Sequence, residues 1–200
     1  MSGVVLAQKA ALRRVLLDRR ARRAPAERRC AAEALAHQAL AAPALARGPR
    51  VACYLSFQDE PDTTALIAGL RTRAIEVIAP LSRPVDRTLD WALVGDAGTR
   101  RGAYGIPEPI GERLGPAALS SCTVAFVPAL AVDHRGRRLG RGAGYYDRAL
   151  AGYSGLVCAV VFDEELVEEL PTEPHDVPVD LALTPSGVFR PERGERSFGL

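Results

Sequence analysis

Residues 123–162 read TVAFVPALAVDHRGRRLGRGAGYYDRALAGYSGLVCAVVF, which places a glycine-rich turn and a short helix between two apolar strands. The strands, expected at 123–127 and 156–162, are continuous apolar runs of the kind buried on both faces in parallel sheets. The helix is expected at 145–151, after the turn. A strand, a helix and a second strand in this order predict a crossover unit of an α/β fold.

The sequence on either side extends this unit into a larger fold. Further helices are expected at 4–22, from Pro25 to about 45, from a cap among 62–64 to about 71, and, short and acidic, at 164–170. Further strands are expected at 51–55, 75–79, 89–94 and 181–184. The segment 95–116 is rich in glycine and proline and should be loop.

Length and composition fit one domain. The chain has 200 residues, of which 48% are hydrophobic and 25% charged, and no apolar run approaches the roughly 18 residues that span a bilayer. The first residues lack the order of a signal peptide. We expect a single three-layer α/β domain over 1–185 with a mostly parallel sheet, N-terminal helices within 1–47 packed on it, and a polar tail at 186–200.

The four cysteines favour a reduced compartment. Cys30, Cys53, Cys122 and Cys158 are far apart and form no CxxC pair, so neither a zinc site nor a redox motif is indicated. Cys53 and Cys158 lie inside apolar runs, as small buried hydrophobes do. A chain of this length builds a core without disulfides, and we expect a cytoplasmic protein.

Charge is distributed unevenly. The formal net charge is +2, but residues 1–29 carry +7 and the remainder −5. A basic N-terminal segment above a mildly acidic body indicates an anionic partner, either a nucleic acid or a small phosphate ligand. All the basic residues except Lys9 are arginine.

The glycine-rich turn has the chemistry of a phosphate cradle. Gly140, Gly142 and Gly144 free the backbone to turn its N–H groups toward one point, and a helix that begins there adds its positive end. The neighbouring cations are Arg137, Arg138, Arg141 and Arg148. The pattern is neither a P-loop nor a dinucleotide fingerprint, and a tight connection is the alternative.

Residues elsewhere in the chain could bind the same phosphate ligand. Lys9 and Arg13 share a helix face at i, i+4, where an anion between them would relieve their repulsion. Asp147 and Asp176 could hold Mg²⁺, which takes one or two carboxylates together with phosphate oxygens and water. His175 is better explained as a surface or structural histidine than as a metal ligand.

Two residues suit a flat heterocycle. Glu60 follows a strand end, where its carboxylate could accept hydrogen bonds from an amino-heterocycle or could serve the dipole of the next helix. Tyr104 lies in a flexible loop, where it could stack on a planar ligand or pack against the protein.

Five segments in this order resemble the 5-formyltetrahydrofolate cyclo-ligase family, also called methenyltetrahydrofolate synthetases. The resemblance runs from Lys9 to about Thr184. The segments are KAALR at 9–13, LSFQDE at 55–60, YGIPEP at 104–109, RLGRGAGYYDR at 138–148 and HDVPVD at 175–180.

The resemblance implies a fold like that of the phosphosugar isomerases and CoA transferases. It also implies a reaction in which MgATP drives 5-formyltetrahydrofolate to 5,10-methenyltetrahydrofolate, ADP and phosphate. The implied ATP-binding residues are Lys9, Arg13, Arg138, Leu139, Gly140, Arg141, Gly142, Ala143, Gly144, Tyr145 and Tyr146. The implied folate-binding residues are Leu55, Glu60, Tyr104 and Tyr145.

The same resemblance implies Arg141, Tyr145 and Asp147 as catalytic residues and Asp147 and Asp176 as magnesium ligands, while leaving Asp180 open as an alternative to Asp176. Many family members carry a lysine where this chain has Ala143, so phosphate binding should depend more on Arg141 and Lys9. We expect a monomer that binds a reduced folate and ATP, with no nucleic acid and no membrane as partner.

Two other interpretations of the function remain. A paralogue could use the same ATP site on another substrate, although Glu60 and Tyr104 are both present. A nucleic-acid-binding module could use the basic N-terminal helices, but no helix-turn-helix or RNA-binding signature accompanies them.

Overall fold

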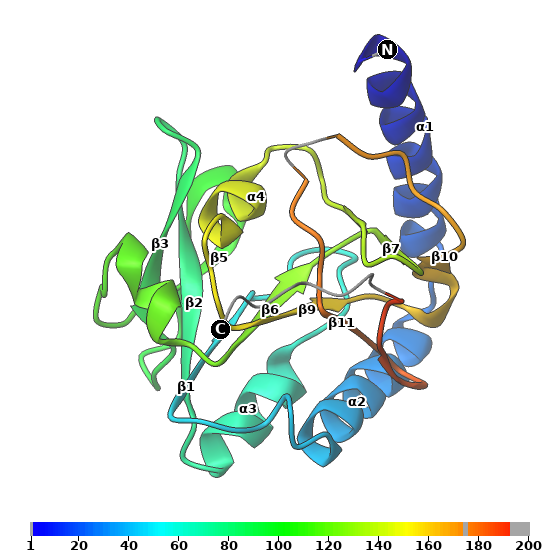
Figure 1. Cartoon of the computed structure of the whole chain (residues 1–200). Helices are drawn as coiled ribbons and strands as arrows, with labels where there is room; N and C mark the ends of the chain where they lie inside the picture. Colours follow the sequence, from blue (N-terminus) through cyan, green and yellow to red (C-terminus); the bar gives the residue numbers. More distant parts are fainter. Residues whose placement is uncertain (1, 174–175, 193–200) are drawn as a thin grey trace, which may run out of the picture.

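A seven-stranded sheet forms the centre of the protein in this computed structural model, which describes residues 2–173 and 176–192 (Figure 1). Its strands are β1 (Arg50–Cys53), β2 (Glu76–Arg83), β3 (Thr88–Leu93), β6 (Val124–Pro128), β9 (Leu156–Val160), β11 (Leu181–Thr184) and β12 (Gly187–Phe189). The order across the sheet is β12-β11-β9-β6-β1-β2-β3. The five inner strands are parallel and the two edge strands antiparallel, which confirms the predicted α/β fold with a mostly parallel sheet.

Successive residues of the inner strands point to opposite faces, and each face has its own apolar core. In β6, Val124 and Phe126 pack on the side covered by α2 (Pro25–Ala41) and α3 (Thr64–Thr72). Ala125 and Val127 pack on the other side, against the 3₁₀ helix η2 (Pro116–Ser121) and α4 (Tyr145–Leu150). Cys53 and Cys158 are fully buried in the first core, as predicted. Burial on both faces explains why these strands are apolar throughout.

The first helix, α1 (Ser2–Ala21), stands at one end of the sheet and carries the N-terminus away from the body (Figure 1). Leu16 anchors it in a third apolar cluster with Leu130, Leu139 and Leu170. A small sheet of order β10-β7-β8 lies beneath, built from β7 (Ala131–Asp133), β8 (Arg138–Leu139) and β10 (Leu166–Val167). The segment 129–139, which precedes the glycine turn, is therefore held under α1.

Four sequence predictions differ from the structure. The second helix ends at Ala41 rather than near 45, because Pro43 disfavours helical backbone at the residue before it. The acidic helix predicted at 164–170 is wrong: a single 3₁₀ turn, η3 (Asp163–Glu165), is followed by β10. That segment pairs with β7 through Val132 and Asp133, so long-range pairing outweighs its local helix propensity.

The other two differences concern segments expected to be irregular. Within 95–116, β4 (Thr99–Arg101) and β5 (Pro107–Pro109) form a two-stranded arm that carries the 3₁₀ turn η1 (Ala103–Gly105) at its tip. In the predicted tail, Gly187–Phe189 returns as β12 beside β11. Both are short antiparallel pairs set by turns, which apolar periodicity does not reveal.

No helix among the described residues is long and apolar enough to cross a membrane. The carboxyl ends of β1, β6 and β9 lie together at one edge of the sheet, because these neighbouring strands run parallel. Ligands of open α/β sheets bind at such an edge.

Candidate functional site

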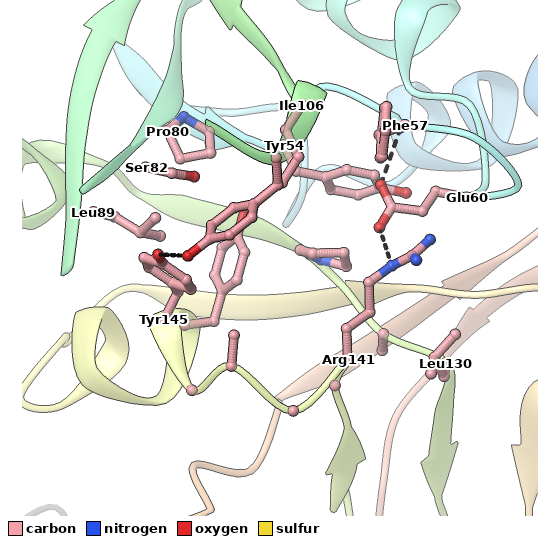
Figure 2. A pocket seen from close by; sticks show the side chains of 18 of the residues that line it. Tyr54, Phe57, Glu60, Pro80, Ser82, Leu89, Ile106, Leu130, Arg141 and Tyr145 are labelled. Carbon is pink, nitrogen blue, oxygen red and sulfur yellow. Dashed lines mark hydrogen bonds and ion pairs between the residues drawn. The ribbon is translucent and has the colours of Figure 1, made fainter. Parts of the chain in front are cut away.

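A cavity of about 350 Å³ opens at this edge of the sheet. Three chain segments far apart in the sequence form its walls: 54–60 after β1, 128–130 after β6, and the glycine-rich turn with the start of α4 at 138–147. The arm at 104–107 and residues of β2 and β3 complete it (Figure 2). The lining is mostly apolar with a few charged groups, as in sites for organic ligands.

The glycine-rich turn curls around the mouth of the cavity. Gly142 and Gly144 have φ of +102° and +71°, which residues with a side chain rarely adopt. Arg13 of α1 donates from Nε to the carbonyl oxygen of Gly140 at 2.8 Å. Arg148 donates to the carbonyl oxygens of Ala143 and Arg87, at 2.9 and 2.8 Å. Two arginines thus hold the turn by its backbone carbonyl groups.

Glu60 and Arg141 join the turn to the loop after β1. Arg141 Nε donates to Glu60 Oε1 at 3.0 Å, and the backbone N–H of Phe57 donates to Oε2 at 3.0 Å (Figure 2). Burial raises the pKa of Glu60, while the charge of Arg141 opposes that rise. Glu60 lines the cavity, where its carboxylate could meet a ligand, and the choice between its two predicted functions stays a prediction.

Tyr104 and Tyr145 face each other across the opening. Their hydroxyl oxygens are 3.4 Å apart, although Tyr104 comes from the arm and Tyr145 from α4. Burial, followed by the hydrogen bond to Tyr104, raises the pKa of Tyr145 to about 12. Tyr104 is 67% exposed and has φ of +58°, an unusual backbone conformation for a residue with a side chain. Its ring is therefore available to a ligand rather than packed in the core.

Lys9 is almost fully buried, at 3% exposure, and lies between two carboxylates. Its Nζ donates to Asp176 Oδ2 at 2.6 Å and to Glu173 Oε2 at 3.0 Å. Lys9 lies outside the cavity wall, but α1 brings it to the loop that carries Asp176. The predicted nucleotide-binding lysine and one predicted magnesium ligand are therefore direct partners.

Asp147, the other predicted magnesium ligand, also accepts a hydrogen bond from a cationic side chain. Arg138 donates from Nη2 to Asp147 Oδ1 at 2.6 Å, and the Val177 N–H lies 3.5 Å from the same oxygen. The residue after Asp176 thus touches Asp147, which places the two aspartates in one neighbourhood. Asp180 instead accepts from the backbone N–H of Val157 at the start of β9, 2.8 Å away.

Most predicted site residues meet in this region. The cavity wall includes Leu55, Glu60, Tyr104, Arg138, Gly140, Arg141, Gly142, Ala143, Gly144, Tyr145, Tyr146 and Asp147. Three others are outside the wall: Arg13 bonds the turn at Gly140, and Lys9 pairs with Asp176. The Leu139 side chain is buried in the cluster under α1. Arg137 faces away, since it pairs with Asp133 and Glu169. His175 lies outside the described residues.

Sequence reasoning missed several lining residues. They are Arg20, Tyr54, Phe57, Pro80, Ser82, Leu89, Ile106 and Pro107, among others. Most are apolar positions, which resemble any other core residue until the chain folds. Arg20 had a detectable signal, because it follows Leu12 and Leu16 at i+8 and i+4 and so lies on the buried face of its helix.

The basic residues near the N-terminus are largely paired within the protein. Arg20 pairs with Glu165, Arg23 with Glu164, and Arg28 with Asp59. The surplus of positive charge at 1–29 is therefore partly neutralised by the body of the chain, which weakens the case for a nucleic-acid-binding face.

Comparison with known proteins gives one consistent family. The model of the 5-formyltetrahydrofolate cyclo-ligase family matches residues 5–185. A 5-formyltetrahydrofolate cyclo-ligase of Mycolicibacterium smegmatis is 38% identical over 144 residues, 69% of this chain and 74% of that protein. Its counterpart in Escherichia coli K12 is 34% identical over 146 residues, 70% of this chain and 79% of that protein.

Solved structures agree. The 5,10-methenyltetrahydrofolate synthetase of Aquifex aeolicus superposes with a TM-score of 0.79 at 32% identity, over 96% of both chains. A synthetase of the same name from Mycoplasma pneumoniae has a TM-score of 0.68 at 18% identity, over 88% of this chain and 97% of that one, which shows likeness of fold.

Proposed function

The chain belongs to the 5-formyltetrahydrofolate cyclo-ligase family, whose reaction converts 5-formyltetrahydrofolate to 5,10-methenyltetrahydrofolate, and we propose that it drives this reaction with ATP and Mg²⁺ at the cavity described above. The observation that carries the proposal is the contact between Arg141 and Glu60. It joins a cation of the glycine turn to a carboxylate suited to an amino-heterocycle, so the phosphate end and the folate end of the site are adjacent.

ATP phosphates fit the turn and the cations around it. The Arg138 guanidinium is buried, and its Nε has no hydrogen-bond partner among the described residues. A buried N–H without a partner costs free energy, and a phosphate oxygen would satisfy it. Lys9, Arg13 and the segment Arg138–Tyr146 would bind the phosphates, with Leu139 contributing only its backbone because its side chain is buried.

Mg²⁺ fits Asp147 and Asp176. Two carboxylates with phosphate oxygens and water are what this ion takes in such sites, and it would neutralise charge on the phosphates. Each aspartate now accepts from a cation, Arg138 or Lys9, that is also assigned to phosphate. If Mg²⁺ and ATP bound together, the two aspartates would hold Mg²⁺ and the two cations would bind phosphate, so that each released group would gain a new partner. Asp176 is preferred to Asp180, whose carboxylate holds the Val157 N–H.

The folate would bind in the apolar part of the cavity. Leu55 offers apolar contact, Glu60 accepts from the amino-heterocycle, and Tyr104 stacks on a planar ring. Tyr145 would lie between the two ligands; its hydroxyl is protonated at neutral pH, as in any tyrosine, and burial raises its pKa further, to about 12. It can therefore donate a hydrogen bond at the reacting centre.

Phosphoryl transfer to the formyl oxygen would begin the reaction. That oxygen attacks the γ-phosphorus as the bond to ADP breaks, which makes the formyl carbon electrophilic. N10 then closes on this carbon, loses its proton, and phosphate leaves. Such chemistry depends on positioning and charge neutralisation more than on acid–base groups. Arg141, Tyr145 and Asp147 are the residues assigned to it.

An absorbance assay tests the proposal. Purified protein mixed with 5-formyltetrahydrofolate and MgATP should show the rising near-ultraviolet absorbance of the methenyl product, and no rise without ATP. ATP binding without product would instead indicate a paralogue that acts on another substrate. Absence of both would refute the proposal. Steep salt dependence of binding to duplex DNA would revive the nucleic-acid alternative.

We further propose that the enzyme works as a cytoplasmic monomer. All four cysteines are free thiols, with Cys53, Cys122 and Cys158 buried, as suits a reducing compartment. Sedimentation of the purified protein at one chain mass would support the monomer.

A further inference from the structure

Arg20 is a buried cation in the wall of the cavity that no part of the family motifs contains. It lies in the last turn of α1 and is only 2% exposed, yet it lines the cavity together with Glu60 and Tyr54. Charged side chains are almost never fully buried without a partner. The identity of its partners therefore indicates what it contributes.

Two of its three guanidinium nitrogens are already used. Nε and Nη2 donate to the two carboxylate oxygens of Glu165, each at 2.6 Å, and Nη2 also donates to the carbonyl oxygen of Ala129 at 2.6 Å. Glu165 is itself 1% exposed and accepts from the Phe162 N–H, which fixes its position. The bidentate pair orients the guanidinium plane rigidly.

The third nitrogen, Nη1, donates to none of the described residues. Among the described residues, the fully buried side-chain nitrogens without a partner are Arg23 Nε and Arg138 Nε. Nη1 of Arg20 is not one of them, so it keeps some accessible surface. Arg20 contributes to the cavity wall, and Nη1 is the one guanidinium nitrogen of this residue that the described partners leave available to a ligand there. The positive charge is balanced by Glu165, so the acceptor that suits Nη1 is a neutral carbonyl rather than a phosphate.

Glu60 lies close to this donor. Ala129 follows β6 and Glu60 follows β1, and these strands are parallel neighbours in which Cys53 pairs with Phe126. The two segments therefore leave the sheet side by side. The charge of Arg20 also counters the rise in the pKa of Glu60 that burial causes. The cavity thus offers a carboxylate acceptor and a guanidinium donor to one ligand edge.

We propose that Arg20 is a specificity residue that donates from Nη1 to the 4-oxo group of the pterin ring while Glu60 accepts from its N3–H and 2-amino group. The edge of this ring presents two donors followed by one acceptor, which matches the carboxylate and the guanidinium. The inference rests on the proposed function, because it takes a reduced folate as the ligand.

A purely structural function of Arg20 makes a different prediction. The pair with Glu165 and the bond to Ala129 also fasten α1 to the sheet, and weakening them would loosen the whole site. Such loosening would reduce the affinity for every folate to the same extent. A contact to one atom of the ligand reduces affinity only for ligands that carry that atom.

Equilibrium binding of two ligands separates these cases. The ligands are 5-formyltetrahydrofolate and its 4-amino-4-deoxy analogue, titrated without ATP into wild-type protein, Arg20→Lys and the control Arg23→Lys. Lysine keeps the charge beside Glu165 but cannot also reach the ligand. Arg23 is in the same part of the chain and pairs with Glu164, but does not line the cavity.

We expect wild-type protein to prefer the 4-oxo ligand, because the 4-amino group would face a donor and N3 of the analogue has no proton for Glu60; the change caused by Arg20→Lys therefore tests the Arg20 contact, not the wild-type preference by itself. Arg20→Lys should weaken 4-oxo binding at least about tenfold, the effect of one charged hydrogen bond, and leave binding of the 4-amino ligand nearly unchanged. Arg23→Lys should change neither. Should Arg20→Lys fail to fold, Arg20→Met with Glu165→Leu removes both charges together and allows the same comparison.

Equal weakening of both ligands, or of neither, would overturn the assignment of Arg20 while leaving the proposed function intact. Wild-type protein that binds neither ligand and makes no methenyl product would instead refute the proposed function, and this inference with it.

Discussion

Replacing Gly142 by alanine should destabilise the protein, whereas the same change at Gly140, two residues earlier, should not. Gly142 has φ of +102°, and a Cβ there would lie 3.3 Å from Arg13 Cζ. At Gly140 φ lies outside the left-handed range and nothing lies within 4 Å of an added Cβ. The two positions share a turn and a chemical change, and neither is fully buried, so most of their difference reflects backbone strain.

The magnitude follows from these two values. Forcing an alanine into left-handed backbone costs about 1–2 kcal/mol. The contact with Arg13 adds little to this, because the end of that flexible side chain can shift by a few tenths of an ångström. In a chain of this size each kcal/mol lowers the melting temperature by about 2–4 °C, so Gly142→Ala should melt about 2–8 °C lower. Gly140→Ala should be neutral or stabilising by up to about 1 kcal/mol, because alanine restricts the unfolded chain.

Thermal unfolding followed by circular dichroism, with urea unfolding as a second measure, gives both values. The steady-state KM for ATP should also rise in Gly142→Ala, because Arg13 moves from its place against the turn. Equal melting temperatures for the two variants would refute the reasoning, since they would show that the turn does not hold Gly142 in the conformation described.

Other changes test the charged groups. Arg141→Ala should lower kcat on the order of 100-fold and raise the KM for ATP. The free energy of unfolding should fall by only about 1 kcal/mol or less, since the Arg141 side chain is partly exposed. An unchanged kcat would remove Arg141 from the site. Lys9→Gln should bind ATP less tightly. In the absence of nucleotide it should bind Mg²⁺ about tenfold more tightly, because Asp176 loses a competing cation. Calorimetry that shows no gain in Mg²⁺ affinity would argue against Asp176 as a magnesium ligand. Burial raises the pKa of Glu60, so folate affinity should fall as the pH is lowered through that raised pKa, and Glu60→Gln should bind weakly at every pH. The same shift means that Glu60 contributes stability below its unfolded pKa and loses that contribution as the pH rises through its folded pKa, so Glu60→Gln should unfold at a higher temperature than wild type at pH 8 but not at pH 4.

Local pattern was sufficient for six of the seven strands of the central sheet and for most helices. Apolar runs such as 123–127 and 156–162 identify strands covered on both faces, and the rule that ligands bind at the carboxyl ends of such strands leads to Glu60 and the glycine turn. The turn itself was evident from the glycines at 140, 142 and 144, and the arginines beside them favoured a phosphate ligand over a tight connection as its explanation.

Elements with few residues and distant partners were not predictable. The segment 164–170 contains acidic and apolar residues in helical spacing, yet Leu166 and Val167 pair with β7, more than 30 residues earlier in the chain. The arm that carries Tyr104 and the edge strand at 187–189 are likewise fixed by their neighbours. Propensity within a short window contains no information on such partners.

The sequence by itself determined the type of fold and the position of the glycine-rich turn, because these depend on local backbone freedom and on burial patterns. Tertiary structure alone decided the pairings: Lys9 with Asp176, Arg138 with Asp147, Arg141 with Glu60, and Arg20 with Glu165. Arg138 and Asp147 meet across the glycine turn, whereas the other three pairs join residues 81 to 167 positions apart. Contacts between such distant segments depend on how strands and helices pack, which no short stretch of sequence encodes.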